Sequence, residues 1–171
     1  CAGFEDIDVR KVDGGMGVFA NCTSLEETDL SQTKVTAIWN RLFLNCTSLK
    51  KIKLPETITA IGSHAFASCK NLTGELDLSG TVVKTIEDHA FYEDSSLLGV
   101  IRLPDTVMEI GKEAFSWEKT AGPAKIYVIT RLSKDKINAE AFRRNVPVCV
   151  CPYLYKIKFD GNGADEGNMD I

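Results

Sequence analysis

The stretch "LKKIKLPETITAIGSHAFASCKNL" at residues 49–72 contains every part of a unit that recurs along the chain. It opens with Ile52-Lys53-Leu54, where one polar residue between two apolar ones indicates a short strand with a single buried face. A proline then turns the chain, and a second apolar pair, Ile58 and Ile61, leads to an Ala-Phe step at 65–66. Nothing in the unit has the length or the 3.6-residue period of a helix.

Phenylalanine marks the period of this unit. Consecutive phenylalanines are separated by 24, 23, 25, 24 and 27 residues, and alanine precedes all the later ones except one, which follows Leu42. One unit of about 24 residues cannot bury its own apolar side chains, whereas stacked copies bury them against one another. The sequence therefore predicts a β-rich solenoid with short parallel strands. The phenylalanines are Phe19, Phe43, Phe66, Phe91, Phe115 and Phe142.

Composition excludes several classes of protein. The chain has 171 residues, 44% of them hydrophobic, and a net charge of −4, so we expect a folded protein that does not bind nucleic acid. No apolar run is long enough to span a membrane, and the opening "CAGFEDIDVR" lacks the features of a signal peptide. We therefore expect either a cytosolic protein or an internal fragment of a longer one. Because no phosphate-binding loop, catalytic carboxylate pair or nucleophile–base motif occurs, we expect neither an enzyme nor a cofactor.

Residues 49–72 resemble the leucine-rich repeat of BspA-like bacterial surface antigens, whose pattern is L-x-x-I-x-L-P-x-x-V-x-x-I-G-x-x-A-F-x-x-C-x-x-L. The resemblance extends over roughly residues 1–145. It implies a right-handed leucine-rich-repeat solenoid of about five to six repeats, in a protein secreted to or displayed on a bacterial cell surface. Proteins of this family are usually associated with adhesion or with binding to host and matrix, and their repeat residues are not catalytic.

Two boundaries follow from departures from the repeat. We expect the solenoid to occupy residues 1–152, with 125–152 as an atypical capping repeat, because that copy lacks the proline and the clean second strand. Residues 153–171 resemble the opening strand and turn of an internalin-type B repeat. The alternative is a terminal hairpin.

Four cysteines share one position of the repeat: Cys1, Cys22, Cys46 and Cys69. We favour a ladder of buried thiols, because free cysteine behaves as a small apolar residue. Neighbouring rungs about 4.8 Å apart are slightly too distant for relaxed disulfides, and a linear ladder does not give the tetrahedral geometry of zinc. A disulfide and a metal site remain the alternatives. Cys149 and Cys151 share one face of a predicted capping strand, where a metal or an oxidised pair is the alternative to simple packing.

The outward residues of the first strands form the candidate binding surface. In solenoids such an extended sheet face is the usual ligand surface. We expect it to bind a protein or glycan ligand on a host cell or matrix, with the chain acting as a monomer at the cell surface. The alternatives are a structural spacer and an accessory module of a larger enzyme. The residues are Asp8, Asp29, Lys53, Asp77, Arg102 and Tyr127.

Three further sets of residues have structural interpretations that we favour. His64 and His89 precede the Ala-Phe step in adjacent repeats and should be solvated neighbours in a column with Arg41, Glu113 and Glu140; metal binding or pH sensing is the alternative. We interpret the N-x-T sequons as by-products of the repeat rather than glycosylation sites, and the tryptophans as apolar caps on turns rather than ligand contacts. They are Asn21, Asn45, Asn71, Trp39 and Trp117.

Overall fold

The computed structural model describes residues 17–94, 96–116, 126–129, 137, 140–142 and 148–151. At strand positions 74, 75, 98, 99, 126, 127, 129 and 148–151 only the backbone is described. The described residues form ten short strands and no helix. The strands are β1 (Glu27–Asp29), β2 (Ala37–Ile38), β3 (Lys51–Lys53), β4 (Ala60–Ile61), β5 (Gly74–Asp77), β6 (Thr85–Ile86), β7 (Leu97–Arg102), β8 (Glu109–Ile110), β9 (Ile126–Ile129) and β10 (Val148–Cys151).

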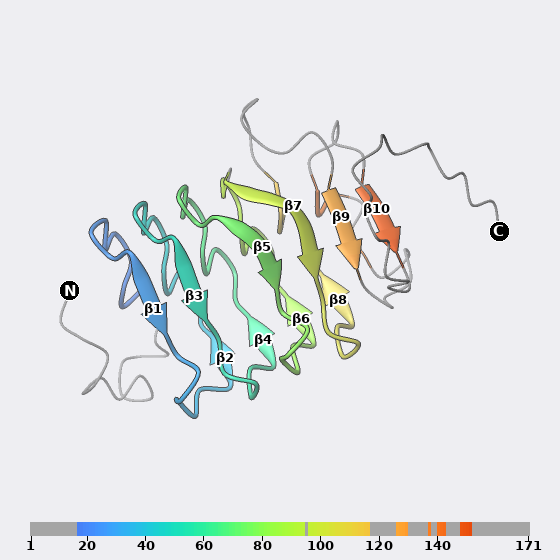
Figure 1. The fold of residues 1–171 in the computed structure, drawn as a ribbon, viewed down its shortest axis with the longest axis horizontal. Helices are drawn as coiled ribbons and strands as arrows, with labels where there is room; N and C mark the ends of the chain where they lie inside the picture. The colour runs from blue at the N-terminus through green and yellow to red at the C-terminus, as the bar shows by residue number, and fades with distance from the viewer. Residues whose placement is uncertain are drawn as a thin grey trace, which may run out of the picture.

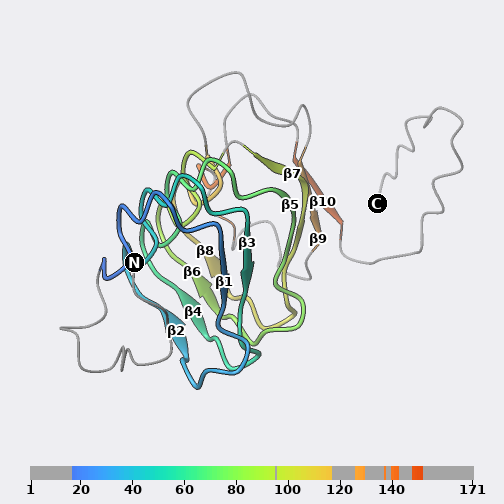
Figure 2. The same cartoon turned by 60° about the vertical axis from the view of Figure 1, so that its left-hand side comes forward.

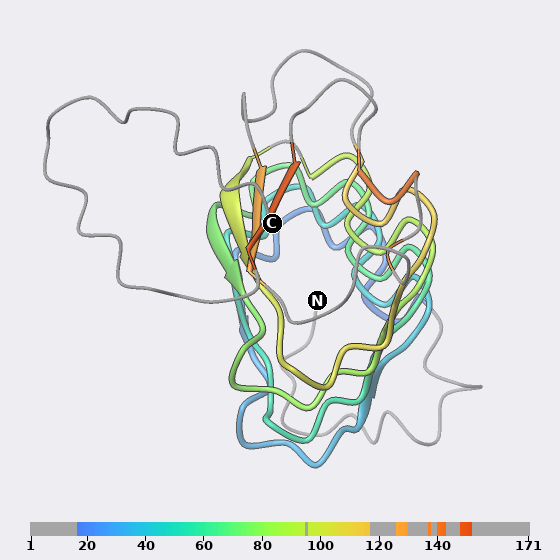
Figure 3. The same ribbon diagram turned by 90° about the vertical axis from the view of Figure 1, so that its right-hand side faces the viewer.

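The chain winds into stacked coils, each of which contributes two strands. We name the four best described coils I (27–50), II (51–73), III (74–96) and IV (97–116); they follow one another along the long axis of the molecule (Figure 1). The first strands of the coils lie on one side and the second strands, β2, β4, β6 and β8, lie on the other (Figure 2). All pairings are parallel, as predicted. Seen along the stack, the coils superpose on one another (Figure 3).

The second strands form one continuous sheet, but the first strands do not. β1 pairs only with β3, whereas β5, β7, β9 and β10 form a separate sheet. Between coils III and IV the register shifts between Gly74 and Leu76, which marks a bulge. The extra residue between Leu72 and Leu76, compared with Leu49 and Ile52, is the sequence counterpart of this irregularity. Coils II and III are therefore joined without pairing of their first strands.

The register of β9 differs from the one predicted from sequence. The pattern Ile126-Tyr127-Val128 was expected to align Tyr127 with Arg102. Instead Val128 pairs with Ile101, and Tyr127 lies beside Val100. The alternation of apolar and polar residues fixes which face a residue occupies, but a shift of two residues keeps that face unchanged. Alternation alone could not exclude the shift.

The core is built on a continuous stack of the marker phenylalanines. Their ring centroids are 5.1 to 5.5 Å apart and their planes are 6° to 12° from parallel along the series from Phe19 to Phe142. Phe43, Phe66, Phe91 and Phe115 are fully buried. Ile38, Ile61, Ile86 and Ile110 from the second strands are also buried, in the same core. Each coil thus buries its apolar residues against its neighbours, as the repeat predicted.

The turn that carries each phenylalanine is a ladder of hydrogen bonds rather than a helical turn. In coil I the N–H groups of Arg41, Phe43 and Asn45 donate to carbonyls of coil II at 2.8–2.9 Å. This geometry requires left-handed backbone at Arg41 and Asn45, with φ of 60° and 58°. The same two positions have positive φ in the coils that follow, with histidine, serine and glutamate in place of glycine.

The cysteine ladder is confirmed for two of its members and is wrong for one. Cys46 and Cys69 are free thiols with no exposed surface. Their sulfurs donate to the carbonyls of Phe19 and Phe43 in the preceding turn, at 3.0 and 3.2 Å. Cys22, however, is disulfide-bonded. Cys22 is only half-buried, whereas Cys46 and Cys69 have no exposed surface. Its side chain is therefore less completely enclosed by the core than theirs.

The coils alternate between two kinds. Coils I and III carry Asp-Leu-Ser after the first strand, and in both the Asp accepts hydrogen bonds from the Ser N–H and hydroxyl at 2.9 and 2.6 Å. Coils II and IV carry Leu-Pro at this place. Their threonines, Thr57 and Thr106, donate instead to Val35 and Val83 of the coil before, at 2.8 and 2.7 Å.

A second feature joins coil I to II and coil III to IV in the same way. Asn40 Oδ1 accepts from the Ser63 N–H at 2.9 Å, and Asp88 Oδ1 accepts from the Lys112 N–H at 2.7 Å. Glycine precedes each of these donors because a Cβ on Gly62 would lie 2.7 Å from the backbone nitrogen of Asn40. The coils are therefore arranged as two similar pairs.

The predicted domain boundaries are described only in part. Residues 126–129, 137, 140–142 and 148–151 of the predicted capping repeat continue the stack through β9, β10 and Phe142. The remaining residues of 125–152, and the predicted B-type repeat or hairpin at 153–171, lie outside the described residues.

Candidate functional site

Four of the six predicted site residues can be placed in full on one surface, which we call the first-strand face. Asp29, Lys53 and Asp77 are exposed at the ends of β1, β3 and β5, and Arg102 is half-buried at the end of β7. Asp8 lies outside the described residues. Only the backbone of Tyr127 is described, two positions away from the place expected for it.

Opposite charges lie in and directly before β1 and β3 on this face, and these charges pair with one another. Lys50 lies 2.8 Å from Glu26, Lys51 3.9 Å from Glu27, and Lys53 2.9 Å from Asp29. The strand register brings these residues opposite each other, since Glu27 pairs with Lys51 and Asp29 with Lys53. An acidic coil beside a basic coil is thus neutralised within the chain, and its charge is not displayed to a ligand as a uniform field.

The Asp29 carboxylate is the most strongly perturbed group of the face. The Ser31 hydroxyl, then Lys53 and the Ser31 N–H, lower the pKa of Asp29 to about 2. Hydrogen bonding and charge from Lys50 likewise lower the pKa of Glu26. The same contacts raise the pKa values of Lys50 and Lys53. These charges therefore persist across the whole physiological range.

The predicted column is divided rather than continuous. Asp77 and Arg102 are register partners on β5 and β7. Asp29 and Lys53 are partners on β1 and β3. Because β3 and β5 belong to different sheets, the structure brings the four residues together as two pairs. The side chains of the two pairs share one face, but the hydrogen-bonded backbone beneath them is interrupted.

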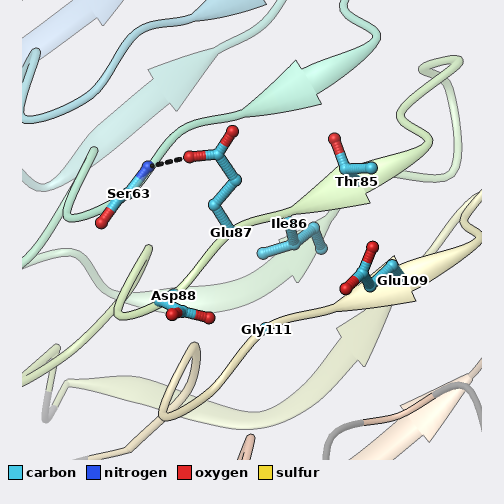
Figure 4. A pocket seen from close by; sticks show the side chains of 7 residues that line it. All are labelled: Ser63, Thr85, Ile86, Glu87, Asp88, Glu109 and Gly111. Carbon is cyan, nitrogen blue, oxygen red and sulfur yellow. Dashed lines mark hydrogen bonds between the residues drawn. The ribbon is translucent and has the colours of Figure 1, made fainter.

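A shallow hollow of about 360 Å³ lies on the opposite side, beside β6 and β8 (Figure 4). Two of its acidic side chains link neighbouring coils: Glu87 accepts from the Ser63 N–H at 3.0 Å, as the dashed line in Figure 4 shows, and Asp88 accepts from the Lys112 N–H. The hydroxyl of Ser63 lies 2.8 Å from Nδ1 of His64. The lining consists of Ser63, Thr85, Ile86, Glu87, Asp88, Glu109 and Gly111.

The predicted histidine column exists and is less solvated than expected. The rings of His64 and His89 stack with centroids 4.7 Å apart, and Tyr92 packs edge-on against His89. Glu113 lies 3.3 Å from His89 Nε2. Both imidazoles are partly buried. Burial, then the neighbouring His89 and Arg41, lower the pKa of His64.

The order of charge along this column matches the direction of the backbone dipoles. In each turn the peptide units that precede residues such as Arg41 and Phe43 point their N–H groups toward the next coil. Aligned peptide dipoles place positive charge at the end where the N–H groups point, as in a helix. Arg41 lies toward the opposite end and Glu113 toward the N–H end, so both charges are favourably placed.

Nitrogens of the predicted sequons also link the coils. Asn45 Nδ2 donates to Asn21 Oδ1 at 2.9 Å, and Asn71 Nδ2 donates to the Thr47 carbonyl at 2.8 Å. The amide nitrogen is the atom that glycosylation would modify. Trp39 is half-buried and packs on the core, in agreement with its predicted apolar role, while Trp117 lies outside the described residues.

One buried acid was missed at the sequence level. Asp94 is 1% exposed and occupies the cysteine position of its coil, three residues after Phe91. Its Oδ1 accepts from the Cys69 N–H at 2.7 Å, and Oδ2 has no hydrogen-bond partner among the described residues. Burial raises the pKa of Asp94 well above its ordinary value. The offset from phenylalanine was the signal available in the sequence.

Comparison with known families confirms the repeat. A family model for the BspA type leucine rich repeat region matches residues 15–121 in six copies. The chain belongs to the BspA-type leucine-rich repeat family. Proteins of this type are typically bacterial surface or secreted proteins, and leucine-rich repeats generally mediate protein interactions without catalysis. No curated protein matches the chain.

A solved structure supports the leucine-rich-repeat fold. The crystal structure of a leucine-rich repeat protein from Bacteroides ovatus is similar with a TM-score of 0.64 and 25% sequence identity. The similarity covers 79% of this chain and 32% of that one, so the chain spans about a third of its neighbour's length.

Two searches of the described residues bear on partners. Within residues whose placement is described, no group of three or more His, Cys, Asp or Glu side chains is arranged to hold a metal ion. The same part of the chain contains no helix that is long and apolar enough to cross a membrane.

Proposed function

We propose that this chain is a non-enzymatic recognition segment of a bacterial protein that is exposed at the cell surface or secreted. It binds a protein or glycan of a host cell or matrix through the first-strand face, as a monomer. The observation that carries this proposal is the set of polar side chains at the ends of β1, β3, β5 and β7, fixed in position by a close-packed phenylalanine core. A rigid surface of this kind favours binding because little side-chain and backbone conformational freedom is lost on contact.

The described part of the first-strand face offers two pairs of oppositely charged residues for this binding. A ligand that contacts Asp29 or Lys53 competes with an ion pair inside the chain. Asp77 and Arg102 lie side by side by register. We propose that the contact includes both pairs, together with the predicted residues Asp8 and Tyr127.

The test is binding of the isolated chain to an array of matrix proteins and glycans, with matched charge reversals on the two sides of the solenoid. Arg102→Glu and Asp77→Lys alter the first-strand face. Lys84→Glu and Glu109→Lys alter exposed residues on the second-strand side. We expect a captured ligand to bind at least tenfold more weakly to the first pair of variants and unchanged to the second.

Equal loss in both pairs of variants would place the ligand elsewhere. If no ligand binds the wild-type chain more strongly than a variant with scrambled charges on the first-strand face, the proposal that this segment mediates adhesion is wrong. Light scattering of the same sample checks the monomer.

A structural spacer is the second candidate, and one observation favours it. The three ion pairs that Lys50, Lys51 and Lys53 form with Glu26, Glu27 and Asp29 neutralise half of the face internally. A spacer needs stiffness rather than a displayed charge. In that case no protein or glycan of the array binds the chain, while solution scattering shows that the solenoid keeps its full length.

A further inference from the structure

Coils II and III are joined differently from the coils within each pair. Their first strands are unpaired, although the Thr73 N–H donates to the Lys50 carbonyl at 3.3 Å directly before these strands. The rest of the joint consists of β4 with β6, the turn ladder, the stacked rings of Phe66 and Phe91, and the contacts of other side chains. One of these contacts is the 2.7 Å hydrogen bond from the Cys69 N–H to Asp94 Oδ1. It connects the end of coil II to a fully buried carboxyl group in coil III.

The cysteine ladder shows what a side chain at this position does. The Cys46 thiol donates to the Phe19 carbonyl, and the Cys69 thiol donates to the Phe43 carbonyl. In each case the acceptor is the phenylalanine carbonyl of the preceding turn. By the same relation, we expect the group at position 94 to face the Phe66 carbonyl. A thiol there would donate, but a carboxylate has no hydrogen to offer and would place negative charge beside a carbonyl oxygen.

We propose that Asp94 is a neutral carboxylic acid in the folded protein, with its Oδ2 hydroxyl donating to the Phe66 carbonyl. It thereby takes the role of the missing thiol and closes the joint between coils II and III. The proposal accounts for Oδ2, which is buried without a partner when the group is treated only as an acceptor. Loss of this proton to solvent leaves a buried charge against a carbonyl and weakens the joint.

The charged and titratable groups around Asp94 oppose its ionisation. Cys69 faces it from coil II, and burial and the nearby Asp94 raise the pKa of that thiol. Glu93 is adjacent in the chain, and its negative charge raises the pKa of Asp94 further. The equivalent position in coil IV is Glu118, which lies outside the described residues. No cation among the described residues forms an ion pair with Asp94 that would hold it ionised.

The sign of the pH effect follows from linkage. An Asp that keeps its proton in the folded state and ionises near pH 3.9 in the unfolded state stabilises the fold most below that pH. Its contribution falls as pH rises, until the folded group also ionises. Between these limits the equilibrium constant for unfolding rises about tenfold per pH unit relative to a variant without the acid.

The test compares the intact chain with Asp94→Asn and Asp94→Cys by urea unfolding between pH 4.5 and 7. Asn keeps an acceptor and a donor, and Cys restores the ladder thiol, so both variants are expected to fold. We expect the unfolding constant of the wild type to rise about tenfold per pH unit relative to both variants. Glu56→Gln, at an exposed position, is the control and should run parallel to the wild type.

A second measurement locates the effect. Cys69 and Cys46 are equally buried and one coil apart, so their relative rate of thiol labelling reports opening at the joint and cancels the common effect of pH on thiols. We expect the ratio of Cys69 to Cys46 labelling to rise severalfold with pH in the wild type and to stay constant in Asp94→Asn. Parallel stability profiles of wild type and Asp94→Asn, or a constant labelling ratio in both, would overturn the proposal.

Discussion

The imidazole rings of His64 and His89 stack 4.7 Å apart and 12° from parallel across the joint between coils II and III. Burial first, and then the neighbouring His89 and Arg41, lower the pKa of His64. His64 therefore couples the surface of the joint to pH at the acidic end, whereas Asp94 acts within the core.

Acidification should destabilise the fold through His64. Its pKa is lowered by burial first, so the folded state binds this proton less tightly than the unfolded state. Stability then falls as pH drops through about 6.5, the ordinary value for histidine. We expect His64→Asn, which tolerates left-handed backbone, to be less sensitive to pH between 7.5 and 5 in urea unfolding. The effect should stay below about 1 kcal/mol because the ring is partly solvated. An unchanged slope in the variant contradicts this prediction.

Removing one ring from the phenylalanine stack should strongly lower the free energy of unfolding. Phe66 lies between the rings of Phe43 and Phe91, at 5.4 and 5.1 Å, and has no exposed surface. We expect Phe66→Ala to lower the free energy of unfolding by about 3–5 kcal/mol, the usual cost of a cavity of this size. Phe66→Leu should lose much less. Chemical denaturation measures both, and equal losses would show that the cavity is not the cause.

Gly62 and Gly80 form a matched pair for testing the approach of two coils. A Cβ on Gly62 would lie 2.7 Å from Asn40 N and 2.9 Å from Ile38 O, whereas one on Gly80 would meet nothing within 4 Å. We expect Gly62→Ala to cost about 1–3 kcal/mol because backbone atoms must shift. Gly80→Ala should be neutral or stabilising by up to about 1 kcal/mol. Differential scanning calorimetry of both variants decides the point, and a tolerated Gly62→Ala would mean that the coils can separate freely.

The Asp29 carboxyl should titrate near pH 2, and Ser31 should matter more than Lys53. The Ser31 hydroxyl bond, at 2.6 Å, is the largest cause of the lowered pKa. We expect Ser31→Ala to move the Asp29 midpoint upward by more than Lys53→Met does, as followed by carboxyl carbon chemical shifts. The opposite order would make the ion pair the main cause.

Much of this fold was predictable because the repeat states the same pattern several times. The spacing of the phenylalanines predicts the stack, and the polar residue between two apolar ones predicts the strands, which are parallel as expected. The first-strand column was predicted less completely. Residues with outward side chains could be chosen from alternation, but the register of Tyr127 could not, because a shift of two residues preserves the alternation.

What sequence reasoning missed consists of departures from the pattern. Asp94 is polar where the preceding coils have a cysteine, so a search for residues that match the repeat pattern does not select it. Thr28 is a similar case: it is 6% exposed at the inward position of β1, where Ile52 and Ile101 stand in other coils. Its hydroxyl has no hydrogen-bond partner within the part of the chain that the structure describes. The disulfide at Cys22 could not be inferred from the ladder, since the ladder assigns every cysteine the same neighbours.

The alternation of coils makes two coils, rather than one, the natural unit of growth for this array. A gene duplication of about 48 residues would keep each Asp-Leu-Ser coil in front of a Leu-Pro coil. Every Asn or Asp acceptor would then keep the N–H that it binds in the next coil. Duplication of a single coil would place two coils of one kind next to each other. Their boundary would then contain two acceptor coils or two glycine coils instead of one of each. Designers who lengthen or shorten this protein should therefore cut it in pairs.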